Sequence, residues 1–127
     1  MLEIARVALH SAAACGRAEV VRLLILKGET VNLRTNDERT ALIIAPQNRA
    51  IDIVRLLLAG GAEIGTKDDY EWTALHYAAF DGAGDIAELL LENGGDVAVK
   101  GSAEKTPLHC VTRGKREDMM VFLLKKE

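Results

Sequence analysis

The chain has 127 residues, of which 49% are apolar and 28% charged, a composition that folds into one domain around a continuous core. Its net charge of −3 excludes the overall basic field that collects phosphates, so we expect no nucleic-acid partner. Its longest apolar runs are too short to cross a bilayer, so we expect no membrane association.

A period of 33 residues organises the chain. One motif recurs at this interval with no insertion or deletion, as Val-Ala-Leu-His, Thr-Ala-Leu-Ile, Thr-Ala-Leu-His and Thr-Pro-Leu-His, starting at Val7, Thr40, Thr73 and Thr106. An acidic residue and an apolar run follow at fixed offsets in every unit. We therefore interpret the chain as a single domain of four repeats, at approximately 4–36, 37–69, 70–102 and 103–127.

Each unit is predicted to form two short helices joined by a turn. The threonine that opens the motif can cap the first helix, because its hydroxyl accepts a free backbone N–H of the opening turn. Gly16 and Gly82 stand where that helix would end in a left-handed conformation that glycine adopts at little cost. The second helix has an apolar stripe at helical spacing, as in 53–58, and a closing glycine such as Gly61.

These motifs resemble ankyrin repeats. The resemblance rests on Thr106-Pro-Leu-His109 and its variant at 73–76, on Ala78-Ala79-x-x-Gly82, and on the run 85–91 with the closing Gly94-Gly-Asp-Val97. It covers essentially the whole chain and implies an all-α solenoid of stacked helix-turn-helix units with β-hairpin or turn connections. It also implies a concave face, formed by the first helices, that usually binds proteins. The family has no intrinsic enzymatic activity, so we expect no catalysis and no cofactor.

The connections depart from the family pattern at one slot. Most ankyrin units carry a glycine two residues before the motif threonine, where this chain has Glu38, Glu71 and Glu104. The substitution removes a residue suited to turns and places an acid at the same level of three successive connections.

Units two and four also depart from the pattern. In unit two, Pro46 replaces an alanine and Arg49 replaces the helix-ending glycine, so we expect a kinked or shortened first helix with Asn48 as the left-handed residue. Unit four has its glycine one residue early, at Gly114. Val121 and Phe122 near the end do not form the polar outer face of a finished terminal repeat. This favours an excerpt from a longer protein, or weak self-association of an otherwise monomeric chain through the C-terminal helix.

The histidines and cysteines do not predict a metal or catalytic site. His10, His76 and His109 occupy one slot of successive units, so stacking holds them about 10 Å apart, and the resemblance places them in a hydrogen-bond network with the motif threonine. Cys15 and Cys110 lie far apart with no group to activate either thiol, so we expect packing residues or free thiols. Widely spaced cysteines and the absence of a sequon favour an intracellular setting, in the cytoplasm or nucleus.

Aromatic residues gather in unit three. They make up 4% of the chain, and four of the five lie within residues 70–80. Tyr77, Phe80 and Asp81 fall on one face of the helix predicted to follow Thr73, opposite the residues that pack inward, so Tyr77 and Asp81 should face the concave groove beside Trp72. We expect a partner-binding site, completed by charged and aromatic neighbours on the connections: Tyr70, Glu71, Asp69, Arg39 and Lys105.

Each aromatic residue also has a structural interpretation. Trp72 could merely cover the base of its hairpin, and Phe80 could fill a gap between units. The acids around the cluster favour a protein or peptide partner that carries basic residues. The function expected is therefore protein recognition on the concave face and hairpin tips. Two alternatives stay open, namely a structural spacer of a larger array and a small inhibitor that occludes an enzyme or transcription factor.

Overall fold

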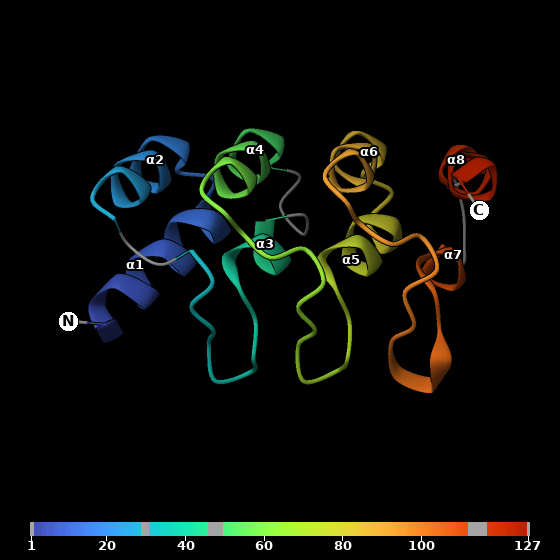
Figure 1. The fold of residues 1–127 in the computed structure, drawn as a ribbon, viewed down its shortest axis with the longest axis horizontal. Coiled ribbons are helices and arrows are strands. Elements are labelled where there is room, and N and C mark those ends of the chain that lie inside the picture. The colour runs from blue at the N-terminus through green and yellow to red at the C-terminus, as the bar shows by residue number, and fades with distance from the viewer. Residues whose placement is uncertain (1, 29–30, 46–49, 112–116, 127) are drawn as a thin grey trace.

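The computed structural model describes residues 2–28, 31–45, 50–111 and 117–126 (Figure 1). Its first helices are α1 (Leu2–Cys15), α3 (Ala41–Ile44), α5 (Ala74–Phe80) and α7 (Pro107–Cys110). Its second helices are α2 (Ala18–Leu26), α4 (Ile51–Ala59), α6 (Gly84–Glu92) and α8 (Glu117–Lys126). A short 3₁₀ helix, η2, covers Ser102–Glu104. The second helices form one row and the first helices form a second row beside it, and three turns project from the side of the first helices (Figure 1). This arrangement confirms an all-α repeat solenoid.

The core runs continuously between the two rows. Leu9, Leu42 and Leu75 occupy one slot of successive first helices, and all three are fully buried. The second helices contribute residues from the predicted stripe, such as Val54 and Leu90. Small residues at Ala78 and Ala79 are also fully buried, which lets neighbouring helices approach closely. No helix in the described part of the chain is long and apolar enough to span a membrane.

The predicted helix boundaries are confirmed by their caps. The Thr40 and Thr73 hydroxyls accept the backbone N–H three residues later, and the His76 side chain completes a capping box with Thr73. Gly16, Gly61 and the other predicted closing glycines adopt positive φ, from +68° to +97°. The repeated threonines and glycines therefore mark where these helices begin and end.

The three connections are turns, and no strand occurs among the described residues, so the β-hairpins implied by the family resemblance are not formed. We call these turns fingers one, two and three, for residues 35–39, 68–72 and 101–105. Each is closed by a backbone hydrogen bond from its first N–H to its last carbonyl, at 2.7–3.0 Å, and by a second bond from the N–H of its glutamate to its first carbonyl, at 2.8–3.0 Å. Both bonds lie within a five-residue turn and do not extend into a ladder. Glu38, Glu71 and Glu104 adopt left-handed φ of 59–63°, so the acids occupy the conformation that favours glycine.

The irregular segments are only partly described. Helix α3 ends at Ile44, ahead of Pro46, and is shorter than α5, as expected for unit two. Pro46, Asn48, Arg49 and Gly114 lie outside the described residues. On α8, Val121 is exposed, whereas Phe122 is half-buried against the core.

Candidate partner-binding site

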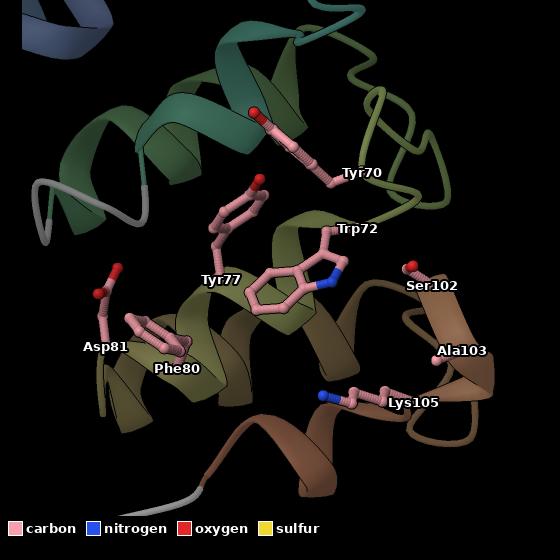
Figure 2. Close-up of a pocket in the computed structure, with 8 residues that line it drawn as sticks. All are labelled: Tyr70, Trp72, Tyr77, Phe80, Asp81, Ser102, Ala103 and Lys105. Carbon is pink, nitrogen blue, oxygen red and sulfur yellow. The ribbon is translucent and has the colours of Figure 1, made fainter.

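A pocket of about 550 Å³ opens over α5, between fingers two and three (Figure 2). Finger two contributes Tyr70 and Trp72 to its lining. Helix α5 and its C-cap contribute Tyr77, Phe80 and Asp81, and finger three contributes Ser102, Ala103 and Lys105. The pocket therefore combines side chains of two successive units.

The helical period of α5 places its contribution to the pocket. Tyr77, Phe80 and Asp81 share one face, while Leu75 and Ala78 on the opposite face are fully buried. This is the arrangement predicted from the sequence. Because the buried face fixes the rotation of the helix, the aromatic face is directed toward the pocket.

Trp72 forms the centre of the aromatic cluster (Figure 2). Its ring centroid lies 5.1 Å from that of Tyr77 and 6.0 Å from that of Phe80, both in tilted geometry. On its other flank it stacks at 5.8 Å on His76. Tyr70 and Phe80 are exposed, while Trp72 and Tyr77 are half-buried. The cluster therefore exposes apolar ring surface that rests on the half-buried rings of Trp72 and Tyr77.

A buried carboxylate orients Tyr77 and finger two. Asp68 Oδ1 accepts the backbone N–H of Tyr70 at 2.9 Å and of Trp72 at 3.0 Å. Its Oδ2 accepts a short hydrogen bond from the Tyr77 hydroxyl and lies 3.4 Å from Arg39 Nε. Arg39 in turn donates to the Tyr77 oxygen at 3.2 Å, and its guanidinium lies 5.5 Å from the centre of that ring. Burial, followed by the bond to Asp68, raises the pKa of Tyr77 to about 12.

The role of Asp68 in this network was not predicted from the sequence, although the repeat carries a signal for it. In the same slot of finger one, Thr35 Oγ1 accepts the N–H groups of Asp37 and Arg39, at 3.3 and 3.2 Å. A residue with a side-chain acceptor at this slot therefore closes the finger in both units. Asp68 differs from Thr35 in its second oxygen, which contacts the Tyr77 hydroxyl and Arg39.

The expected site residues are only partly brought together. Trp72, Tyr77, Tyr70, Asp81 and Lys105 line the pocket, and Arg39 lies behind Tyr77. Glu71 and Asp69 are exposed and do not line the pocket, although they are neighbours of Tyr70 in the sequence. Phe80, for which the sequence left a gap-filling role open, also lines the pocket, and the structure adds Ser102 and Ala103, which were not in the expected set.

The histidines form the hydrogen bonds that the resemblance implies. His76 is fully buried, with Nδ1 accepting the Thr73 N–H at 3.1 Å and Nε2 lying 2.8 Å from the Lys105 carbonyl. It thereby connects α5 to finger three. His109 forms the equivalent Nδ1 bond to the Thr106 N–H, whereas His10, whose unit has Val7 in place of the threonine, bonds through Nε2 to the Leu33 carbonyl. Within the described ranges, no group of three or more His, Cys, Asp or Glu residues could hold a metal ion.

The burial of His76 makes stability depend on pH. Burial lowers the pKa of His76 below its ordinary value of 6.5, because the charged form loses hydration and a proton on Nδ1 would oppose the Thr73 N–H. Below about pH 6.5 the unfolded chain then binds more protons than the folded chain, so the free energy of unfolding falls as pH falls. Urea melts between about pH 7.5 and 5.5 should show this slope, and His76→Gln should flatten it. Equal slopes in both proteins would contradict the assignment.

The two cysteines differ in exposure. Cys110 is buried in α7, and burial raises the pKa of its thiol to about 11, so it remains protonated at neutral pH. Cys15 is exposed at the end of α1. A protonated, buried thiol is a packing group, as the sequence analysis expected for Cys110.

The chain is similar to one known family. A family model described as "Ankyrin repeats (3 copies)" matches residues 5–68 and again residues 60–127, and the two matches together span nearly the whole chain. None of the curated proteins compared with the chain matches it.

Proposed function

The chain belongs to the ankyrin-repeat family, whose members are generally protein-interaction modules and typically non-catalytic, and from this premise we propose that it binds a protein or peptide through the pocket of unit three. The partner would lie across α5 and fingers two and three. Recognition would involve no covalent step, because the scaffold supplies a preformed surface and the partner fits to it.

The observation that carries this proposal is the exposure of aromatic rings on a fixed base. Tyr70 and Phe80 are exposed beside Trp72, and their partners in the cluster are held by the Asp68 hydrogen bonds. Rigid aromatic side chains lose little conformational entropy on binding and dominate the energetics of many interfaces. A partner that covers this cluster gains apolar burial without ordering the scaffold.

The charges around the pocket suggest the chemistry of the partner. Asp81 stands at one end of the pocket and Lys105 on the finger opposite (Figure 2). Asp69 and Glu71 are exposed on finger two. Acids outnumber bases here, which supports a partner segment carrying lysine or arginine close to an apolar anchor. Such exposed charges act mainly on the association rate and on the choice of partner.

Two double variants test the pocket. Tyr70→Ala with Phe80→Ala removes exposed rings, and Trp72→Ala with Tyr77→Ala removes the half-buried ones. Each pair should weaken binding at least about 30-fold, because truncation of an interface anchor costs about 2 kcal/mol or more. The measurement is capture of partners on immobilised protein, followed by titration of each purified partner.

Leu26→Ala is the matched control, since Leu26 is a large exposed apolar residue on α2, away from the pocket. It should bind as wild type does. Thermal melts check folding, and the Tyr70/Phe80 pair keeps the test valid if the Trp72/Tyr77 pair unfolds. Partners that bind wild type and both double variants equally would contradict the proposed site.

A further inference from the structure

Finger three differs from the other two fingers in its first residue. Thr35 and Asp68 begin fingers one and two, and their side-chain oxygens accept N–H groups of the same finger. Gly101 begins finger three and has no side chain that could do this. The backbone differs as well, since finger three has two successive residues with left-handed φ, Ala103 and Glu104, where each of the others has one. Finger three therefore closes without a side-chain acceptor of its own.

As a result, finger three presents hydrogen-bond donors to the pocket. The Ala103 N–H forms no hydrogen bond with any described residue, whereas the equivalent N–H groups of Asp37 and Tyr70 are bonded inside their fingers. The Ser102 hydroxyl likewise has no partner in the part of the chain that the structure describes. Both residues line the pocket together with Lys105, and the exposed carboxylate of finger three, Glu104, does not. This wall is therefore suited to bind an acceptor.

The charge of Lys105 strengthens this wall. Its side chain is exposed and extends from finger three into the pocket (Figure 2). Other basic residues of the finger region have partners within the chain, since Arg39 pairs with Asp68 and the Lys67 ammonium donates to the Lys100 carbonyl at 2.7 Å. Lys105 forms no ion pair across the described ranges. Its positive charge is therefore available to a ligand in the pocket.

The opposite end of the pocket is acidic and aromatic. Asp81 lies there at the C-cap of α5, next to the exposed ring of Phe80 (Figure 2). The chain already holds one cation in similar surroundings, because the guanidinium of Arg39 lies 5.5 Å from the centre of the Tyr77 ring and its Nε lies 3.4 Å from Asp68 Oδ2. A carboxylate beside an aromatic ring is thus a combination that attracts a basic side chain. The two ends of the pocket have opposite polarity.

On the premise that this pocket is the binding site, we propose that its ligand is a bipolar protein segment. An apolar side chain of the segment lies on the rings of Tyr70 and Phe80, a basic residue lies at Asp81, and the side-chain carboxylate of an Asp or Glu lies at Lys105 and Ser102. The segment carries both charges because a purely basic one would place a positive charge beside Lys105, and a purely acidic one would place a negative charge beside Asp81. The opposite charges also give the segment a single direction across the pocket.

Selection from a displayed library of random peptides, panned on the immobilised full chain, tests this polarity. The recovered peptides should share an apolar residue with Lys or Arg on one side and Asp or Glu on the other, always in the same order. Panning on Lys105→Glu should replace the acid of this pattern with a base and retain the apolar residue. Panning on Asp81→Asn should remove the preference for the base and retain the acid.

Lys100→Glu is the matched control for Lys105→Glu. Lys100 is exposed one residue before finger three and does not line the pocket, so the variant has the same change in charge outside the site. Panning on it should recover the wild-type pattern. Circular dichroism checks that all the variants are folded.

A recovered peptide is then synthesised and titrated by calorimetry. Lys105→Glu should bind it about tenfold more weakly than wild type, because an attraction is replaced by a repulsion. Exchanging the acid of the peptide for lysine should restore binding to Lys105→Glu and weaken binding to wild type. This reciprocal exchange identifies the contact, which a general loss of stability in the variant would not reproduce.

The outcomes separate the polarity from the pocket itself. Peptides that lose binding to the Tyr70→Ala/Phe80→Ala variant, but carry no acid or bind Lys105→Glu as wild type, would overturn the bipolar ligand and leave the pocket as the binding site. Peptides that bind the Tyr70→Ala/Phe80→Ala variant as tightly as wild type would contradict the pocket as well. Recovery of no peptide above background would also overturn the bipolar ligand, while partner capture still tests the pocket.

Discussion

Replacing Asp68 with alanine is expected to lower the free energy of unfolding by about 3 kcal/mol, because removing a buried carboxylate leaves both its hydrogen-bond donors and its ion-pair partner uncompensated. The Asp68 side chain is completely buried and serves four groups, namely two backbone N–H groups of finger two, the Tyr77 hydroxyl and Arg39. Arg39 is itself largely buried, so its charge would lose its partner in a poorly hydrated place. Urea denaturation followed by circular dichroism measures the loss.

Asp68→Thr separates the two roles of this residue. Thr35 shows that a threonine in this slot can accept both N–H groups of its finger. Asp68→Thr should therefore retain the turn and lose the bonds to Tyr77 and Arg39, with roughly half of the destabilisation caused by alanine. Equal stability of wild type and Asp68→Ala would show that the buried network contributes nothing to folding.

Replacing Gly101 with alanine is expected to cost about 2 kcal/mol, the usual range for forcing an extra carbon into a packed site. A Cβ at Gly101 would lie 2.6 Å from the Glu71 carbonyl oxygen, 3.2 Å from His76 Nε2 and 3.3 Å from Trp72 Cδ1. The Glu71 oxygen is a backbone atom, so relief requires that fingers two and three move apart. Those fingers form two sides of the pocket, and the emission of Trp72 should change as well.

Gly65→Ala is the matched control for Gly101→Ala. A Cβ at Gly65 would meet no atom within 4 Å, and its φ is in the ordinary range. The substitution should change stability by less than about 0.5 kcal/mol. If Gly101→Ala is as stable as Gly65→Ala and its Trp72 emission is unchanged, the close approach of the two fingers is not a constraint on the fold.

The features that follow from local chemistry were predictable from the sequence. Thr73 caps α5 and Gly82 follows it with positive φ because each depends on residues within one turn of the helix. The face of α5 was predictable for the same reason, since the helical period alone separates Tyr77 from Leu75. Repetition strengthened these predictions, because four units had to agree.

The features that depend on distant residues were not predictable. Arg39 lies 38 residues before Tyr77, so nothing in the sequence indicated that it would occupy the back of the ring instead of the partner surface. Glu71 was assigned to the site because it adjoins Trp72, but its left-handed backbone belongs to the tip of the finger and its side chain lies outside the pocket. The fingers themselves close as short turns without a ladder, a property of their packing that strand propensity does not capture.

The fluorescence of Trp72 tests the central claim most directly, because Trp72 is the only tryptophan in the chain and lies at the centre of the pocket. A partner without tryptophan is titrated into the protein while Trp72 emission and acrylamide quenching are recorded, and calorimetry measures the binding independently. Emission should shift to shorter wavelength and quenching should fall in step with the calorimetric saturation. Saturable binding that leaves both the emission and the quenching of Trp72 unchanged would contradict the pocket of unit three as the contact surface.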